Sequence, residues 1–290
     1  MRRKPLNRFQ LFIWRACVLL VILTIVFAFY KVTEAVLKFS LEGDPEAVVS
    51  VQKQTALEQQ TPEQKPPGPA FPELKKPVKC IALTFDDGPH PEFTLKLLNV
   101  LEQHDVKATF FVVGKMAVKY QGLLRAIHEY GHEIGNHTFN HPLLTKVSKA
   151  IVADELEKGR SAINSLTGSD VLFFRPPSGR YDSETVRIAA AHGLYTILWS
   201  VNSLDYGCNS SRDIEARVLA NPSDGDIVLL HSGVKATLEA LPAIIEGLKG
   251  KGFELKTLSE MMHEKCGNPK PGLFKSFRGP QDSLAVKSEK

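Results

Sequence analysis

The alternation of short apolar segments with helical patterns between residues 78 and 266 constrains the fold of this chain most strongly. Seven segments have the composition of buried strands: Ile81–Phe85, Ala108–Val113, Glu133–Asn136, Val171–Arg175, Thr196–Val201, Asp226–Leu230 and Phe253–Lys256. Six helical patterns lie between them: Phe93–His104, Met116–Tyr130, Lys149–Thr167, Ser183–His192, Ser211–Ala220 and Lys235–Leu248. Strands that alternate with helices through short loops run parallel, with right-handed crossovers. We therefore predict an α/β fold, a distorted (β/α) barrel with about seven parallel strands.

The part of the chain that precedes this domain divides into three segments. Residues 1–10 are rich in Arg and Lys, residues 11–30 are nearly all apolar with Arg15 as the one charge, and residues 31–77 are rich in Gln, Glu and Pro. The basic flank places the N-terminus in the cytoplasm by the positive-inside rule. We expect a cytoplasmic N-terminus at 1–10, a transmembrane signal anchor at 11–30 and a polar linker at 31–77. A cleaved signal peptide followed by secretion is the alternative.

Charge and cysteine usage exclude several other classes of protein. The formal net charge is only +4 and no nucleic-acid-binding motif is present, so we expect no nucleic-acid partner. The four cysteines are not spaced like a zinc knuckle or a redox pair. A disulfide between Cys208 and Cys266 is possible outside the cytoplasm. Residues 267–290 are polar with scattered Gly and Pro, which predicts a flexible C-terminal tail.

Polar clusters stand where the predicted strands end, and in such folds the active site gathers at the carboxyl ends of the strands. The first strand ends in Asp86-Asp87, the third runs into His137, and the sixth runs into His231. Alternation along a strand points Asp86 and Asp87 to opposite faces. The two carboxylates can share one site only if the strand stops there and Gly88 lets the backbone turn.

The spacing of two histidines indicates a metal site. His137 and His141 are four residues apart, so a helical turn or a tight loop places both imidazoles on one side. With one carboxylate from a neighbouring strand, they give two His and one Asp ligand. That is the ligand count of a catalytic zinc or a similar ion, with positions left open for water and substrate.

Five segments, in this order, resemble the five motifs of the polysaccharide deacetylase family, the NodB-homology domains of carbohydrate esterase family 4. The resemblance covers Lys79–Met262 and lies in Thr84-Phe85-Asp86-Asp87-Gly88-Pro89, His137-Thr138-Phe139-Asn140-His141-Pro142, Arg175-Pro176-Pro177-Ser178-Gly179, Trp199-Ser200-Val201-Asn202-Ser203-Leu204-Asp205-Tyr206 and Leu229-Leu230-His231. It implies a deacetylase domain over residues 78–266.

The resemblance also implies a role for each matching residue. The metal ligands are Asp87, His137 and His141, and the cofactor is a divalent ion, Zn²⁺ or alternatively Co²⁺. Asp86 is the catalytic base and Arg175 holds it, while His231 is the catalytic acid and Asp205 orients it. The backbone N–H of Ser178 meets the oxyanion, Leu229 lines the pocket for the acetyl methyl, and Tyr206 stands where the family usually has Trp in the groove wall.

Two further positions depart from the family pattern, and they bear on substrate choice. Ser178 replaces an aromatic residue and Asn202 replaces an acid. The charges over Lys149–Lys158 are interpreted as a solvated helix face. We expect a monomer that removes N-acetyl groups from an extracytoplasmic polysaccharide, with peptidoglycan as the substrate. The alternatives are chitin oligosaccharides, poly-N-acetylglucosamine or O-acetyl-xylan as substrate, a non-catalytic glycan-binding module, and a metal phosphoesterase.

Overall fold

The computed structural model describes residues 78–267, 269–278 and 283–284. The expectations for residues 1–77, including the membrane anchor and the linker, lie outside the described residues. Within the described residues, no helix has both the length and the apolar character that a membrane span needs.

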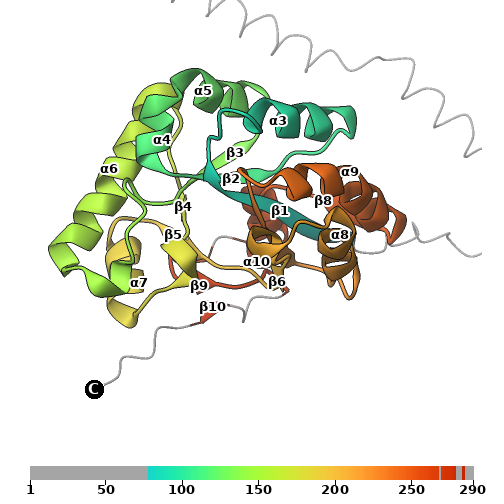
Figure 1. Cartoon of the computed structure of the whole chain (residues 1–290). Coiled ribbons are helices and arrows are strands. Elements are labelled where there is room, and N and C mark those ends of the chain that lie inside the picture. Colours follow the sequence, from blue (N-terminus) through green and yellow to red (C-terminus); the bar gives the residue numbers. More distant parts are fainter. Residues whose placement is uncertain (1–77, 268, 279–282, 285–290) are drawn as a thin grey trace, which may run out of the picture. The chain divides into compact units, whose positions relative to one another are not determined.

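The described strands form one curled sheet. Helices α3 to α9 cover its outer side, from α7 and α6 round to α9 and α8, whereas α10 packs on the inner side (Figure 1). The strands are β1 (Lys79–Gly88), β2 (Thr109–Val112), β3 (Glu133–Asn136), β4 (Phe173–Phe174), β5 (Tyr195–Ile197), β6 (Val201–Asn202), β7 (Asp226–His231), β8 (Phe253–Leu255), β9 (Leu273–Phe274) and β10 (Ser283–Leu284). The helices are α3 (Thr94–Gln103), α4 (Gly114–Lys119), α5 (Gln121–Glu129), α6 (Lys149–Thr167), α7 (Ser183–Ala191), α8 (Ser211–Leu219), α9 (Lys235–Gly250) and α10 (Leu258–Cys266).

The long strand β1 organises the sheet, because it pairs in parallel with β2, β7 and β8. Its side chains alternate between two apolar clusters. Ile81, Leu83 and Phe85 pack in the large cluster shared with the outer helices. Cys80 and Ala82 lie in a second cluster with residues of β2, β4, β5 and β7, which fills the inner side of the curled sheet. This parallel arrangement agrees with the prediction of a distorted (β/α) barrel.

The predicted strand Thr196–Val201 is two short strands in the structure, and they are far apart in the strand order: β6 is the edge strand beside β7, whereas β5 lies between β4 and β9. β5 pairs with β4, while β6 pairs with β7. Residues 198–200 therefore connect two strands that share no neighbour in the sheet. Leu198 N donates to Phe274 O, and Ser200 N donates to Ile227 O. The apolar run itself contains no signal for this connection, because the change of partner is set by the curvature of the sheet. The predicted helix Met116–Tyr130 is also divided, because Tyr120 has a non-helical backbone between α4 and α5.

The C-terminal segment differs from the prediction of a flexible tail beginning at residue 267. β9 pairs in parallel with β5, and Leu273, Phe274 and Phe277 are buried. Phe277 N donates to Gly225 O at 2.7 Å. Gly225 has φ +82°, and a Cβ there would lie 2.4 Å from the Phe277 backbone, so this contact requires glycine. Phe274 and Phe277 cover the inner cluster at this end of the sheet, while Leu273 packs with Val186 and Leu198, and so short an apolar stretch shows no regular periodicity in the sequence.

Candidate active site

The two adjacent aspartates reach one site through an irregularity in β1. Phe85 pairs with Phe110 of β2, and the next pair is Gly88 with Val112. Asp86 and Asp87 therefore stand opposite one residue of β2, which is a β-bulge. The strand continues to Gly88 rather than stopping, and Asp87 itself takes a left-handed backbone with φ 67°. The expected turn at Gly88 thus lies one residue earlier, and it re-aims the Asp87 side chain.

The three expected metal ligands converge at this bulge, with potential ligand atoms of Asp87, His137 and His141 all within 4.8 Å of one another. Asp87 Oδ1 lies 3.2 Å from His141 Nε2 and 3.4 Å from His137 Nε2. Atoms bound to a tetrahedral Zn²⁺ at about 2.0–2.2 Å are about 3.3–3.6 Å apart. The donor types and their spacing therefore fit a divalent metal ion.

Neighbouring contacts put the side chains of Asp87 and His137 in the protonation states that bind a cation. His137 Nδ1 lies 2.8 Å from Arg175 O, so it donates its proton there and leaves Nε2 as a free lone pair. Burial alone raises the pKa of a carboxyl, but the adjacent imidazoles of His137 and His141 outweigh burial and hold the pKa of Asp87 well below its usual range. Asp87 is therefore ionised at neutral pH.

A buried glutamate supports the loop that joins the two histidines. Thr138 and His141 both have positive φ, an unfavourable conformation for residues other than glycine. Glu155 of α6 is only 5% exposed, and it accepts hydrogen bonds from the backbone N–H groups of Phe139 and Asn140 and from the Asn140 amide. The interpretation of residues 149–158 as a solvated helix face is therefore wrong at Glu155. The only indication of this role of Glu155 in the sequence is a single carboxylate on the apolar side of an amphipathic helix.

The expected base, Asp86, is paired with a fully buried cation. Arg175 Nη1 donates to Asp86 Oδ1 at 2.7 Å and to Thr84 Oγ1 at 2.8 Å. Its Nε and Nη2 donate to the carbonyls of Ile197 and Leu198, and its guanidinium lies 4.1 Å from the centre of the Phe111 ring. A buried charge is tolerated only when it is paired and hydrogen-bonded. Arg175 therefore fixes the orientation of Asp86.

The expected acid, His231, lies directly beside Asp86, because the two residues are register partners on the parallel strands β7 and β1. Asp205 Oδ1 is 2.6 Å from His231 Nδ1, and Asp205 Oδ2 accepts from His231 N and from Thr237 Oγ1. Burial lowers the pKa of His231, but the hydrogen bond with Asp205 and the charge of Asp86 outweigh it and raise that pKa. His231 is thereby favoured in its protonated, donating form.

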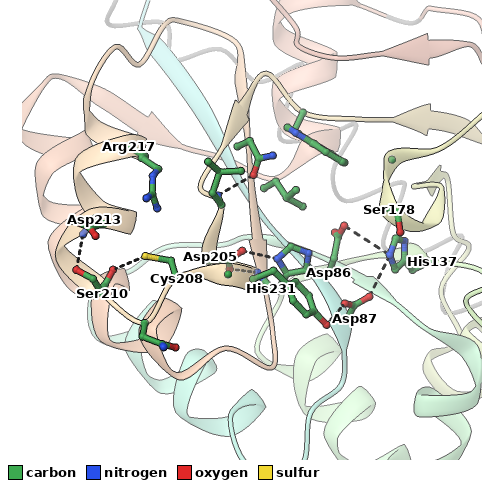
Figure 2. A pocket seen from close by; sticks show the side chains of 18 of the residues that line it. Asp86, Asp87, His137, Ser178, Asp205, Cys208, Ser210, Asp213, Arg217 and His231 are labelled. Atoms are coloured by element: carbon green, nitrogen blue, oxygen red, sulfur yellow. Dashed lines mark hydrogen bonds and ion pairs between the residues drawn. The ribbon is translucent and has the colours of Figure 1, made fainter.

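These groups line a groove of about 1010 Å³. Figure 2 shows Asp86 between His231 and His137, with Ser178 above His137 in this view and with Arg217 and Asp213 of α8 on the far side of His231. Leu229, Asn202 and Tyr206 also line the groove. Ser178 has φ 57°, and the hydrogen bonds of its turn are donated by Gly179 N and Arg180 N. The Tyr206 hydroxyl donates to Asp87 Oδ2 at 3.0 Å. Although most of the side chain is exposed, the partial desolvation of this hydroxyl and the negative charge of Asp87 raise the pKa of Tyr206 to about 12.

Comparison with known proteins assigns the chain to a family. A family model described as polysaccharide deacetylase matches residues 73–197. A peptidoglycan-N-acetylglucosamine deacetylase of Bacillus cereus is 39% identical over 185 residues, covering 62% of this chain and 67% of that protein. The chain belongs to the polysaccharide deacetylase family.

Other members of the family show how its activities vary. PgdA of Listeria monocytogenes, a peptidoglycan-N-acetylglucosamine deacetylase, is 37% identical over 212 residues, and the match spans 73% of this chain but only 44% of PgdA. PdaA of Bacillus subtilis, named a peptidoglycan-N-acetylmuramic acid deacetylase, is 34% identical, covering 64% of this chain and 73% of PdaA. A family 4 pseudoenzyme from Bacillus anthracis has a TM-score of 0.63 and 32% identity, covering 65% of this chain and 67% of that chain. Membership in the family therefore leaves activity to be argued from the site.

The structure brings every residue named from the family motifs into this one site. The metal-ligand, base, acid and groove positions all line the groove, and Arg175 lies buried behind Asp86. The motif resemblance had no position for Glu155 or Thr237, which hold other site residues in place. The suggested disulfide with Cys266 is not formed, because Cys208 carries a free thiol in the groove wall.

Proposed function

We propose that this chain is a metal-dependent hydrolase that removes N-acetyl groups from peptidoglycan. One observation carries the proposal: a carboxylate held by a buried arginine and a histidine held by a buried aspartate lie side by side next to a metal-ligand triad. A general base and a general acid with opposed environments are what the hydrolysis of an amide needs.

A divalent ion bound by Asp87, His137 and His141, which we take to be Zn²⁺ with Co²⁺ as the alternative, would supply Lewis acidity that polarises the acetamide carbonyl and activates water. Asp86 takes a proton from the attacking water as the new C–O bond forms. The Ser178 N–H would donate to the developing oxyanion. His231 then gives its Nε2 proton to the leaving nitrogen as the C–N bond breaks, which releases acetate and the free amine.

The rival within the family is a non-catalytic glycan-binding module, which the Bacillus anthracis pseudoenzyme makes a real alternative. Binding alone does not need a buried Arg175–Asp86 pair, a His231–Asp205 pair and a metal triad together. Each buried charge costs desolvation energy, and a well-packed apolar pair at the same place would be as stable or more stable. The complete set of acid, base and ligand residues therefore supports catalysis.

Peptidoglycan is favoured over chitin by the names of the relatives and by one residue of the groove. Arg217 lines the groove, and its one hydrogen bond in the described part of the chain is with Ser203 O. Peptide-bearing glycans carry carboxylates, whereas chitin carries none, and a guanidinium recognises a carboxylate well.

We also propose an extracytoplasmic location with residues 11–30 as the anchor, or secretion after cleavage. The support is the apolar run with its basic flank. Fractionation of cells, with protease added from outside, measures which compartment holds the domain.

The experiment that tests the function incubates the full chain with Zn²⁺ and with either purified peptidoglycan or a chitin oligomer, and it measures released acetate. Asp86→Asn is the matched control, because it changes one atom of the base. We expect acetate from peptidoglycan with the wild type and none above background with the variant. Arg217→Gln should lower the efficiency on peptidoglycan more than on chitin. No acetate from any acetylated glycan would sink the catalytic proposal and leave the binding module.

A further inference from the structure

The two oxygens of Asp87 have different environments. Oδ1 faces the histidines, at 3.2 Å from His141 Nε2 and 3.4 Å from His137 Nε2. Oδ2 is the acceptor of the Tyr206 hydroxyl, at 3.0 Å. One carboxylate oxygen of Asp87 therefore faces the position of the metal ion, and the other accepts a hydrogen bond from the phenol of Tyr206.

A short turn and a ring contact place the Tyr206 hydroxyl at Asp87. Tyr206 lies in the short turn Asp205–Gly207, which Leu204 enters with φ 53°. Its ring packs edge-on against His231, with centroids 4.3 Å apart and planes at 84°. The residue is 68% exposed, yet its hydroxyl reaches across the site to a residue 119 positions away in the sequence. The expected role as groove wall does not require that contact.

We propose that Tyr206 is a positioning residue for the metal ion: its hydroxyl holds Asp87 so that the carboxylate binds through Oδ1 alone. This inference rests on the metal site of the proposed function. A donor on Oδ2 opposes bidentate binding, and it restrains a side chain whose backbone is already in an unfavourable conformation. Hydrogen-bond partners of metal ligands typically change metal affinity 10- to 100-fold when they are removed.

The same turn contacts both the metal-ligand triad and the acid His231. The turn that carries Tyr206 also carries Asp205, the partner of the acid His231. One short segment therefore positions both the group that orients the acid and the group that orients a metal ligand. A phenylalanine at position 206 would keep the ring packing on His231 and lose only the contact with Asp87.

The test is a metal titration of the full chain after removal of metal by a chelator. Zn²⁺ is added in competition with a chromogenic chelator to the wild type, to Tyr206→Phe and to Tyr195→Phe. The last is the matched control, since Tyr195 donates its hydroxyl to Pro269 O and is not among the groove residues. We expect the Kd for Zn²⁺ to rise 10- to 100-fold in Tyr206→Phe and to stay unchanged in Tyr195→Phe. The absorption spectrum of bound Co²⁺ should change only in Tyr206→Phe, because the carboxylate becomes free to bind through both oxygens.

Melting temperatures of the metal-free proteins distinguish weaker Zn²⁺ binding from misfolding. We expect metal-free Tyr206→Phe to have the same melting temperature as the metal-free wild type. A Kd within twofold of the wild type, with an unchanged Co²⁺ spectrum, would overturn the inference and leave the proposed function standing. A wild type that binds neither ion would overturn both the inference and the metal site.

Discussion

Replacing Asp205 by Asn should disable the acid while leaving the metal ligands in place. Asp205 is 1% exposed and accepts three hydrogen bonds, from His231 Nδ1, His231 N and Thr237 Oγ1. An asparagine has a single acceptor oxygen. If that oxygen keeps the two donors now on Oδ2, its NH₂ group faces His231 Nδ1. The ring must then accept a hydrogen bond at Nδ1, which disfavours the protonated form.

The magnitude follows from the contacts that are lost. A hydrogen bond to a charged group contributes about 1.5–3 kcal/mol, and a tenfold change in an equilibrium corresponds to about 1.4 kcal/mol. In the wild type, Asp205 helps to raise the pKa of His231 against the opposing effect of burial. Because the acid works only when protonated, rates fall as pH rises through that pKa. The variant should therefore lose activity at a lower pH, with the alkaline limb moved by about one to two pH units, and its best rate should fall by about 10²–10⁴-fold.

The assay is the pH profile of kcat/KM for acetate release, with metal content measured on the same samples. Asp226→Asn is the control, because Asp226 is as deeply buried as Asp205 and is also a carboxylate. It lies at the start of β7, at the opposite end of that strand from His231, and it pairs with Arg278. This substitution should destabilise the protein without moving the limb. An alkaline limb in Asp205→Asn that coincides with the wild type would refute the assignment of His231 as the acid or of Asp205 as its partner.

Three further predictions concern the metal, its loop and the groove. His137→Ala should lose bound metal, whereas Asp86→Asn should keep it and be inactive; full metal occupancy in His137→Ala, measured by atomic spectroscopy, would contradict the ligand assignment. Glu155→Gln replaces one acceptor oxygen by an NH₂ group, which cannot accept the hydrogen bonds that Phe139 and Asn140 now donate. The affinity for Zn²⁺ should therefore fall about tenfold in the chelator competition. An unchanged affinity would show that the loop between His137 and His141 keeps its conformation without Glu155. Ser178→Tyr should keep the metal and lower the ratio of kcat/KM on peptidoglycan to that on chitin, because an added ring narrows the groove; an equal change on both substrates would exclude Ser178 from specificity.

The sequence by itself determined the parts of the protein that depend on local pattern. Apolar runs bounded by helical periodicity indicated the strands of the barrel, and parallel strands bring their carboxyl ends together wherever they occur. This is why Asp86, His137, Arg175 and His231, each at the end of a different strand, could be assigned to one site before any coordinate was known. The order of the five motifs then supplied their chemistry.

Only the tertiary structure decided the features that depend on distant partners. The bulge that turns Asp87 toward the histidines appears only when β1 pairs with β2, and the split of 196–201 appears only when the sheet curls. Glu155 has the composition of any charged helix residue until its helix packs against the histidine loop. Tyr206 meets Asp87 across 119 residues of sequence. Propensity and periodicity act over a few residues, whereas these contacts are set by how whole elements pack.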